Sequence, residues 1–351
     1  MAKAVSLIYR TKMQRTKFRG FLNRNDHSES ARLFWITYIL DRYTSMTARE
    51  PYLLQDNDIG ITLEDMISDY RAGHIFPGGG QASFDILKFR VQLGIIQGRL
   101  YDSLYSVRAD RQSPEDKEAS RVQIDTMLDQ WYSSLPYSVK TSNFSAMEPA
   151  VRQHCHLLHM IYYQTIFTVH DAALHNYNWI RCLRDFSRKW RADKQKAKKA
   201  YADTPVLMSN WPKLLETARA QVDILSSLDP PGNTWMAHMS HKGLRLTGIY
   251  ATEGALTILA ANNIAAFERA THDHLTKDEE RIQKAWSNIK NLQNEYRGGQ
   301  PGQYHHQEIN IGSEELVREA GWCYDKYFNK RQRPNYWVDK MNANPASFGI
   351  Y

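Results

Sequence analysis

The pattern of hydrophobic and polar positions predicts a protein built from α-helices. One segment, Arg32–Arg42, is apolar almost all round, whereas an amphipathic surface helix would leave a polar face. We therefore expect this segment to form a helix buried at the centre of the fold. Asp26 and Glu29 precede it at the spacing of a capping box, and Pro51 cannot continue a helix.

The rest of the chain repeats the helical pattern of apolar residues at intervals of three and four. No segment alternates between apolar and polar residues as a half-buried strand would, and no repeat of fixed period occurs. The fold is therefore predicted to be all-α, a single irregular array of about eight or nine helices. Further helices are predicted over residues 83–107, 113–136, 147–176, 215–228, 234–269, 276–298 and 313–328.

Composition divides the 351-residue chain into three parts. Residues 1–25 hold seven basic residues and no acidic residue, so they are predicted to form a basic N-terminal segment. Residues 26–330 are predicted to form the helical domain, with a basic linker or insert near residues 184–205, and residues 331–351 a C-terminal tail. A hydrophobic content of 42% supplies enough apolar side chains for a core.

Charged residues gather where the apolar helix ends and the next loop begins. Asp41 and Arg42 close the apolar run, and Arg49, Asp56 and Asp58 follow. Buried charges are tolerated mainly when they are paired, so we predict a salt-bridged corner that locks the helix to the loop. An acid/base catalytic cluster is the alternative, but structural ion pairs use the same residue types. We therefore expect Asp41, Arg42, Arg49 and Asp58 to be structural ion-pairing residues.

The stretch from Arg32 to Ile59 resembles the central signature of the fungal zinc-cluster transcription factors, which lies in the regulatory segment called the middle homology region. The pattern of that family is a basic residue, Phe-Trp, an aromatic residue, Leu-Asp-Arg, a small residue, Arg-Pro and Asp-x-Asp-Ile. One departure is Glu50, which separates Arg49 from Pro51 where the family has the two residues adjacent. The matching residues are Arg32, Phe34, Trp35, Tyr38, Leu40, Asp41, Arg42, Ser45, Arg49, Pro51, Asp56, Asp58 and Ile59.

Two later stretches are similar to the same family. One is Leu128–Pro136, which has the spacing Leu-x-x-Trp-x-x-x-Leu-Pro. The other is Leu158–Leu174, which has His170, Asp171 and Ala172 where the family often has His-Arg-Pro. Together with the signature, these stretches span roughly Ala31–Leu174, about two-fifths of the 351 residues, and beyond this span the match is only in helical character.

This resemblance implies a regulatory domain of a fungal-type transcription factor, which acts in the nucleus and modulates DNA-templated transcription. In that family a separate N-terminal cluster of six cysteines binds two zinc ions and reads the DNA. The three cysteines of this chain, Cys155, Cys182 and Cys323, lie far apart and have no zinc-ligand spacing. We therefore expect no cofactor in this chain. We also expect this chain to correspond to the later part of such a regulator. The explanations left open are a natural truncation, a partial gene model, or a protein that never contacts DNA itself.

The resemblance also implies the transcription machinery or a related regulator as a partner, and leaves a dimer and a small-molecule inducer open. Two other functions stay open. One is a partner-binding module that dimerises with full-length regulators and inhibits them. The other is a helical small-molecule binder or enzyme with a pocket at the aromatic-rich helix 158–167, although core packing explains the same residues. A zinc cluster encoded just upstream of Met1 would favour the regulatory domain over both.

The net charge is +7, and basic residues are concentrated in residues 1–25 and in Arg184–Lys199. Such blocks suit nucleic acid, acidic partners or nuclear import, although most basic blocks are solvated surface. Because neither block comes with a zinc cluster, a basic zipper or a helix-turn-helix, we expect only weak, sequence-independent binding to DNA. The candidate nuclear-import or phosphate-contact residues are Arg188, Lys189, Arg191, Lys194, Lys196, Lys198 and Lys199.

Other chemistry is not indicated. His154, His156 and His159 cannot all share one face of a helix, and no His-Glu-x-x-His or Gly-x-Ser-x-Gly motif occurs. We therefore predict neither a metal site nor an enzyme. The uncharged stretch Gly254–Phe267 falls short of the ~20 apolar residues that a membrane span needs, so no membrane contact is predicted.

Overall fold

The contacts within the chain cluster in two compact units in the computed structural model, and each unit is described separately. The first unit comprises Met1–Asp171 and Ile224–Trp235, and the second comprises Ala172–Asp223 and Met236–Tyr351. The structure describes residues 1–15, 24–66, 74–76, 83–140, 147–170, 177–192, 210–226, 242–265, 272–297 and 315–324.

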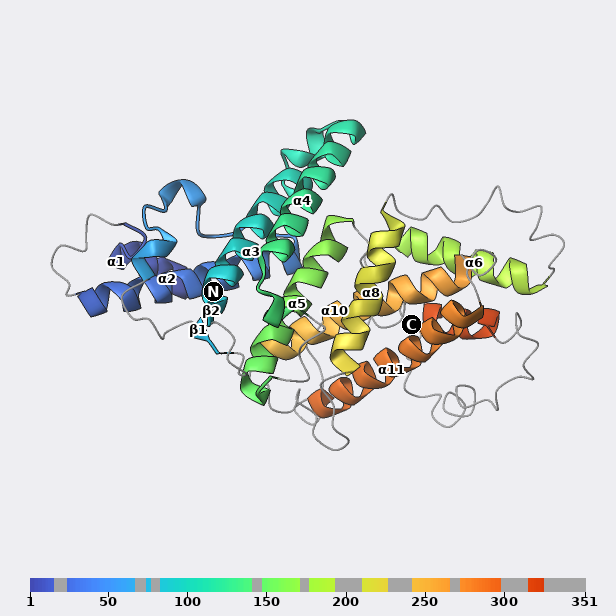
Figure 1. Ribbon diagram of the computed structural model, residues 1–351. Helices are drawn as coiled ribbons and strands as arrows, with labels where there is room; N and C mark the ends of the chain where they lie inside the picture. The colour runs from blue at the N-terminus through green and yellow to red at the C-terminus, as the bar shows by residue number, and fades with distance from the viewer. Residues whose placement is uncertain are drawn as a thin grey trace. The chain divides into compact units, whose positions relative to one another are not determined.

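Helices make up nearly all of the described secondary structure, which confirms the all-α prediction (Figure 1). The helices of the first unit are α1 (Ala2–Thr11), α2 (Arg24–Ala48), α3 (Ile86–Leu100), α4 (Pro114–Ser134) and α5 (Pro149–Val169). Short helical turns lie at η2 (Asp56–Asp58), η3 (Leu63–Met66), η4 (Tyr101–Tyr105), η5 (Ala109–Arg111) and η6 (Tyr137–Val139). The second unit contains α6 (Tyr177–Ala192), most of α8 (Trp211–Ser226), α10 (Lys242–Ala265), α11 (His272–Arg297) and helical residues 315–324. The division into an N-terminal segment, one helical domain, a basic insert and a tail stays a prediction.

The first unit also contains one antiparallel pair of two-residue strands, β1 (His74–Ile75) and β2 (Phe84–Asp85). His74 pairs with Asp85, and Ile75 pairs with Phe84. A strand of two residues is too short to show an alternation of apolar and polar positions. The hydrophobic pattern therefore carried no signal of this small sheet.

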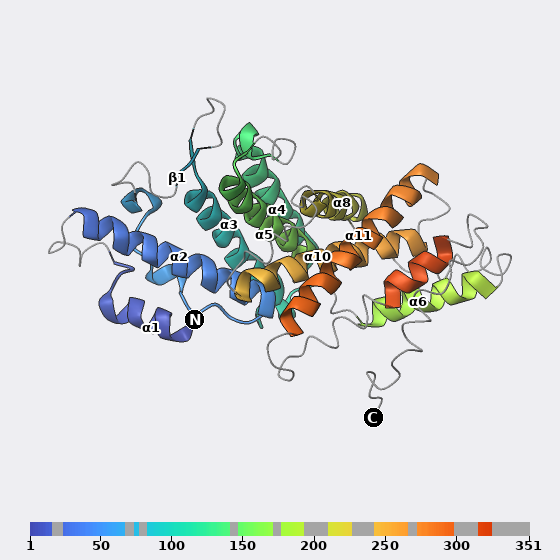
Figure 2. The same cartoon turned by 90° about the horizontal axis from the view of Figure 1, so that it is seen from below.

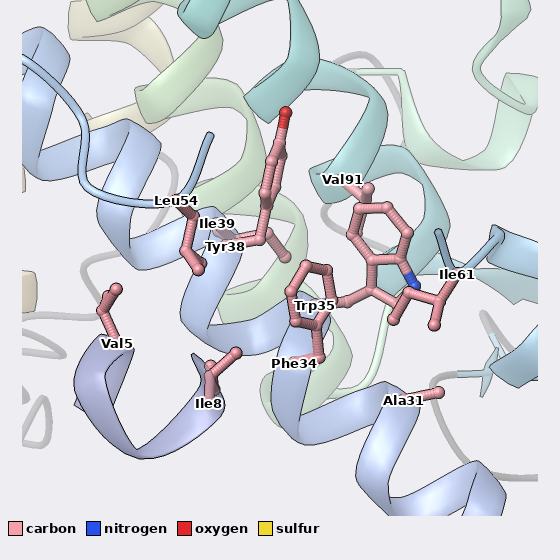
Figure 3. Packing of buried hydrophobic residues seen from close by; sticks show 10 residues of the cluster. All are labelled: Val5, Ile8, Ala31, Phe34, Trp35, Tyr38, Ile39, Leu54, Ile61 and Val91. Atoms are coloured by element: carbon pink, nitrogen blue, oxygen red, sulfur yellow. The ribbon is translucent and has the colours of Figure 1, made fainter. Parts of the chain in front are cut away.

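Helix α2 supplies the core of the first unit. It packs along α3 and contacts α1 and η3, while α3 also contacts α4 and α5 (Figure 2). The ring of Trp35 makes edge contacts with Phe34 at 5.1 Å and Tyr38 at 5.3 Å between centroids. Side chains from α1, the loop after α2 and α3 close around these rings (Figure 3). The cluster consists of Val5, Ile8, Ala31, Phe34, Trp35, Tyr38, Ile39, Leu54, Ile61 and Val91.

Burial of α2 differs from the prediction on one side of the helix. Trp35 and Tyr38 are 5% and 1% exposed, so the aromatic face is core as expected. The opposite side is not covered, because Leu33, Ile36 and Leu40 are 49%, 45% and 44% exposed, so the helix lies in the core by one face only. A helix that is apolar on both faces does not reveal which face its neighbours cover.

The predicted helix caps have different outcomes. Helix α2 begins at Arg24, so Asp26 lies inside the helix and the capping box proposed there is wrong. The cap of α4 is confirmed, because the Ser113 hydroxyl accepts a hydrogen bond from the Asp116 backbone N–H at 3.1 Å and Pro114 is the first helical residue. The cap satisfies a backbone donor that the first turn leaves without a partner.

Helix α10 is the buried helix of the second unit. It packs against α11 and α6, and its side chains are buried from Ala251 to Ile264. The indole N–H of Trp211 on α8 donates to Asn262 Oδ1 on α10 at 3.2 Å. None of the described helices combines the length and the apolar character that crossing a bilayer requires.

Candidate functional site

Arg42 is the centre of the charged cluster that follows the hydrophobic face of α2. Its side chain is completely buried. The Nη1 group lies 3.2 Å from Asp41 Oδ2, and the Nη2 group donates to the Leu54 carbonyl at 2.9 Å and to Asp56 Oδ1. The guanidinium also lies over the Tyr52 ring, 3.6 Å from its centroid, in a cation–π contact. The charge of Arg42 is therefore compensated by carboxylates, a carbonyl and an aromatic face.

Asp41 ties the loop after α2 to the helix. Its carboxylate accepts hydrogen bonds from the backbone N–H groups of Leu53 and Leu54, the latter at 2.9 Å. The Tyr38 hydroxyl adds a further link by donating to Asp56 Oδ1 at 3.0 Å. Helix and loop are thus joined by charge-assisted bonds, the arrangement predicted for this corner. We call this cluster the signature corner: Tyr38, Asp41, Arg42, Tyr52, Leu54 and Asp56.

Arg49 ends helix α2 in a left-handed conformation, with φ at 56°. The Glu50 N–H donates to the Ser45 carbonyl at 3.1 Å, which is the hydrogen bond that closes a Schellman motif. The Ser45 hydroxyl in turn donates to the Glu50 carbonyl. Glu50, the residue that departs from the family pattern, therefore completes the helix end. The Arg49 guanidinium lies over the Tyr105 ring, 4.7 Å from its centroid.

Asp58 does not join the corner. It lies exposed in the single turn η2, and within the described part of the chain no ion pair includes it. The prediction that Asp58 is an ion-pairing residue is therefore wrong. In the same short turn, Asp56 is the residue that reaches Arg42. Arg32 is half-buried at one side of the core, and Pro51 is exposed in the loop.

Gly98 on α3 is a part of the corner that the sequence reasoning missed. A Cβ atom at this position would lie 2.8 Å from Arg42 Nε, closer than such atoms approach without a shift. Gly94, one turn earlier, would place its Cβ at an ordinary 3.5 Å from Tyr38. The spacing Gly-x-x-x-Gly is the signal in the sequence that could have indicated this close approach of α3 to α2.

Tyr52 was also missed, although its ring covers the Arg42 guanidinium. The Tyr52 hydroxyl donates to Asp102 Oδ2 at 2.8 Å, which fixes the ring over Arg42. Burial and the bond to Asp102 raise the pKa of Tyr52, and burial raises the pKa of the Asp102 carboxyl. The tyrosine therefore stays neutral and acts as a hydrogen-bond donor.

The basic block on α6 is partly neutralised inside the second unit. Arg191 Nη2 lies 2.7 Å from the buried carboxylate of Glu319, and Arg188 lies 3.3 Å from Glu319 and 3.2 Å from Glu315. Lys189 is exposed on the same helix. Two of the candidate phosphate-contact residues are thus occupied by acidic partners. Four others, Lys194, Lys196, Lys198 and Lys199, lie outside the described residues.

The aromatic-rich helix α5 is part of the core. The ring of Tyr162 stacks on Trp131 and Tyr132, at 5.3 and 5.0 Å between centroids. His159 is buried beside Tyr132, and its Nδ1 atom donates to the Cys155 carbonyl at 2.9 Å. Burial lowers the pKa of His159 to about 4 and that of His156 to about 3. Within the described ranges, no group of His, Cys, Asp and Glu residues has the arrangement of a metal site.

Comparison with known proteins agrees with the resemblance noted in the sequence. Residues 1–133 match the family model described as the fungal specific transcription factor domain. The matched region contains α1, α2 and α3, most of α4 and the entire signature corner. It also includes the basic N-terminal segment, whose residues Val5 and Ile8 pack against α2.

Curated relatives match a little under half of the chain. ABC-transporter-regulating transcription factors of Aspergillus oryzae and Aspergillus fumigatus are each 25% identical over 170 residues, which is 48% of this chain and 19% of each relative. An uncharacterized transcriptional regulatory protein of Schizosaccharomyces pombe is 29% identical over 164 residues, 46% of this chain and 21% of the relative. The chain thus spans about a fifth of the length of these relatives. No solved structure matches it.

Proposed function

We propose that this chain, whose residues 1–133 match the fungal specific transcription factor domain, works in the nucleus as a regulatory domain whose DNA is read by a separate element. The family match carries this proposal. The curated relatives support it, because their names describe transcription factors or transcriptional regulatory proteins.

The signature corner supports a structural rather than a catalytic use of the charged residues in this domain. Arg42 is enclosed by Asp41, Asp56 and the ring of Tyr52, and the Asp41 carboxylate is occupied by two backbone N–H groups. Groups held in this way lock a helix to a loop and leave little capacity for proton transfer to a substrate. We propose that the corner keeps the domain in one shape, which its partners in transcription recognise.

The domain is further proposed to act without a cofactor of its own. In such a factor the zinc ions would belong to the separate DNA-reading element. The partners that fit this role are the transcription machinery or a related regulator.

A reporter assay in a fungal cell tests the proposed function. The 351-residue chain is fused to an unrelated DNA-binding domain, and transcription from a promoter that carries its site is measured. We expect the fusion to change reporter transcription relative to the DNA-binding domain alone. Arg42→Ala should abolish the change because the corner loses its central cation, whereas the matched exposed variant Asp58→Ala should retain it. Unchanged transcription from a folded fusion that reaches the nucleus would contradict the proposal.

A further inference from the structure

Three arginines of α6 form a row that a later helix of the second unit covers. Arg184, Arg188 and Arg191 follow at intervals of four and three, so they share one side of α6. Residues 315–324 form a short helix beside α6 (Figure 2), and its two glutamates reach these arginines. We call the three arginines the arginine row and residues 315–324 the covering helix.

Each arginine of the row contacts a carboxylate of the covering helix. Arg184 Nη1 lies 3.5 Å and Arg188 Nη2 lies 3.2 Å from Glu315 Oε1. Arg188 Nε lies 3.3 Å from Glu319 Oε1, and Arg191 Nη2 lies 2.7 Å from Glu319 Oε2. Both carboxylates, which are one helical turn apart, are thus engaged by the row.

The covering helix completes the charge balance of the row. Asp185 on α6 lies 3.1 Å from Arg184 and compensates that arginine from within its own helix. The two glutamates of the covering helix then balance the other two arginines. Without these glutamates, two positive charges would remain uncompensated on one side of α6.

The packing of α6 does not depend on the covering helix alone. Helix α6 also contacts α10, and its apolar residues Ile180, Leu183 and Phe186 are buried. The ion pairs lie at the outer edge of the contact, since the side chains of Arg188 and Arg191 are 52% and 26% exposed. Ion pairs that water reaches contribute little to stability and weaken as salt rises. The row is therefore held by contacts that a competing anion can replace.

The chemistry of the basic block selects the anion. The block Arg184–Lys199 contains eight basic and two acidic residues, so its positive charge is spread along the chain. Such a distribution matches the repeated phosphates of a nucleic-acid backbone, whereas one acidic helix would engage the row alone. Guanidinium groups also bind phosphate oxygens through two parallel hydrogen bonds.

We propose that the arginine row binds nucleic-acid phosphates, and that the covering helix competes with the phosphates for the same guanidinium groups. The covering helix thus acts as an intrachain inhibitor of this contact. Contacts to phosphates hold a duplex without reading its bases, so the binding that is released has no sequence preference. The inference does not depend on the proposed role in transcription.

Neutralising the covering helix tests this competition in the full chain. Binding is measured by fluorescence anisotropy at about 100 mM salt, with a labelled duplex of about 20 base pairs. Glu315→Gln combined with Glu319→Gln should lower the dissociation constant at least about tenfold. The same pair should steepen the fall of log K with log salt by about 1.8, the value for two further phosphates.

A charge-matched control separates the row from the net charge of the chain. Glu216→Gln combined with Glu280→Gln removes two acidic charges from exposed positions of the second unit. This pair should lower the dissociation constant by less than about threefold, since distant surface charges are screened at this salt concentration. Arg188→Gln with Arg191→Gln, added to the two substitutions in the covering helix, should abolish their gain.

A covalent lock tests the covering helix at constant charge. Ser187 Oγ lies 3.2 Å from Cys323 Sγ, so Ser187→Cys places a thiol of α6 beside a thiol of the covering helix. The lock is made in the Glu315→Gln background, with the exposed Cys182 replaced by serine. The reduced chain should bind the duplex more tightly than wild type, and oxidation should remove this gain.

Circular dichroism confirms that each variant is helical. Glu315→Gln alone leaves the buried Glu319 charged, and it should give a smaller gain in the same direction if the double substitution does not fold. The inference is overturned by equal gains in the two glutamine pairs, by a gain that survives loss of the arginines, or by equal binding of the reduced and oxidised chains. Tighter binding of polyglutamate than of the duplex would also overturn it and assign the row to an acidic protein.

Discussion

Arg42 shows how one charged residue is accommodated in an apolar core. It is completely buried, yet its two Nη groups and one face of its guanidinium meet groups that compensate the charge: Asp41, Asp56, the Leu54 carbonyl and the Tyr52 ring. Burying a cation is costly unless such partners are in place. The same contacts join α2 to the loop that follows, so the buried charge holds residues 53–56 of that loop against the helix.

Arg42→Ala is therefore expected to destabilise the first unit by about 3 kcal/mol, because the carboxylates of Asp41 and Asp56 lose their cation. The measurement is the free energy of unfolding from a urea titration followed by circular dichroism. Asp58→Ala is the control, and its effect should stay within about 0.5 kcal/mol because Asp58 is exposed. Equal effects of the two substitutions would contradict the structural role of the corner.

Substitutions of Gly94 and Gly98 on α3 test how closely this helix approaches α2. Gly98→Ala places a Cβ 2.8 Å from Arg42 Nε, and the contacts of the guanidinium prevent it from moving away, so we expect a loss of about 1–3 kcal/mol. Gly94→Ala meets Tyr38 at an ordinary 3.5 Å, and alanine favours the helix by up to about 1 kcal/mol. Thermal or urea unfolding of both variants measures the difference. Similar stabilities would show that α3 and α2 do not approach closely at Gly98.

Helices α2 and α5 show that the burial of a helix depends on its neighbours as well as on its own sequence. Both are rich in apolar residues, but α5 is buried on every side from Cys155 to His170, whereas α2 leaves Leu33, Ile36 and Leu40 exposed. Helix α5 contacts both α3 and α4 in the first unit. Burial on every side also encloses polar groups of α5, including the imidazoles of His156 and His159.

Burial of His159 predicts a dependence of stability on pH. Its pKa is lowered to about 4 in the folded chain, below the usual value near 6.5, so the unfolded chain binds more protons between these limits. The free energy of unfolding should therefore fall as the pH decreases from 6.5 towards 4, by about 1 kcal/mol per pH unit for one such group. Urea titrations between pH 6.5 and 5 measure the slope. His159→Phe keeps a ring beside Tyr132 and should reduce the slope, whereas an unchanged slope would assign it to other groups.

The chain divides into two compact units, and the match to the family model lies in the first of them. The family match ends at residue 133, so it lies entirely within the first unit. The second unit contains the basic helix α6, in which Arg188 and Arg191 are bound to Glu315 and Glu319. These ion pairs reduce the positive charge that α6 could offer to phosphates.

The chain is accordingly expected to bind DNA weakly and without sequence preference. The net charge of +7 allows contacts with phosphates, and such binding falls steeply with salt because it depends on counterion release. A competition assay near physiological salt compares one duplex with scrambled DNA of the same length. A preference of about a hundredfold for one sequence, equivalent to about 2.7 kcal/mol, would show that the chain carries its own DNA-reading element.

Local patterns in the sequence determined the class of the fold and the position of its charged corner. The periodicity of apolar residues indicated helices, Pro114 and Ser113 marked the start of α4, and Asp41 and Arg42 are neighbours in the chain. Each of these signals lies within a few residues, because helical hydrogen bonds and caps act over one or two turns. The extra residue Glu50 was also recognised, but its part in the helix end appeared only with the backbone conformation.

Tertiary packing decided which partners meet across long separations in sequence. It placed Gly98 against Arg42, Tyr52 against Asp102, and Glu319 against Arg191, 128 residues away. It also selected which apolar face of α2 became core and which stayed exposed. Periodicity cannot supply these results, because it reports the direction of a side chain around its own helix and contains no information on which other helix arrives there.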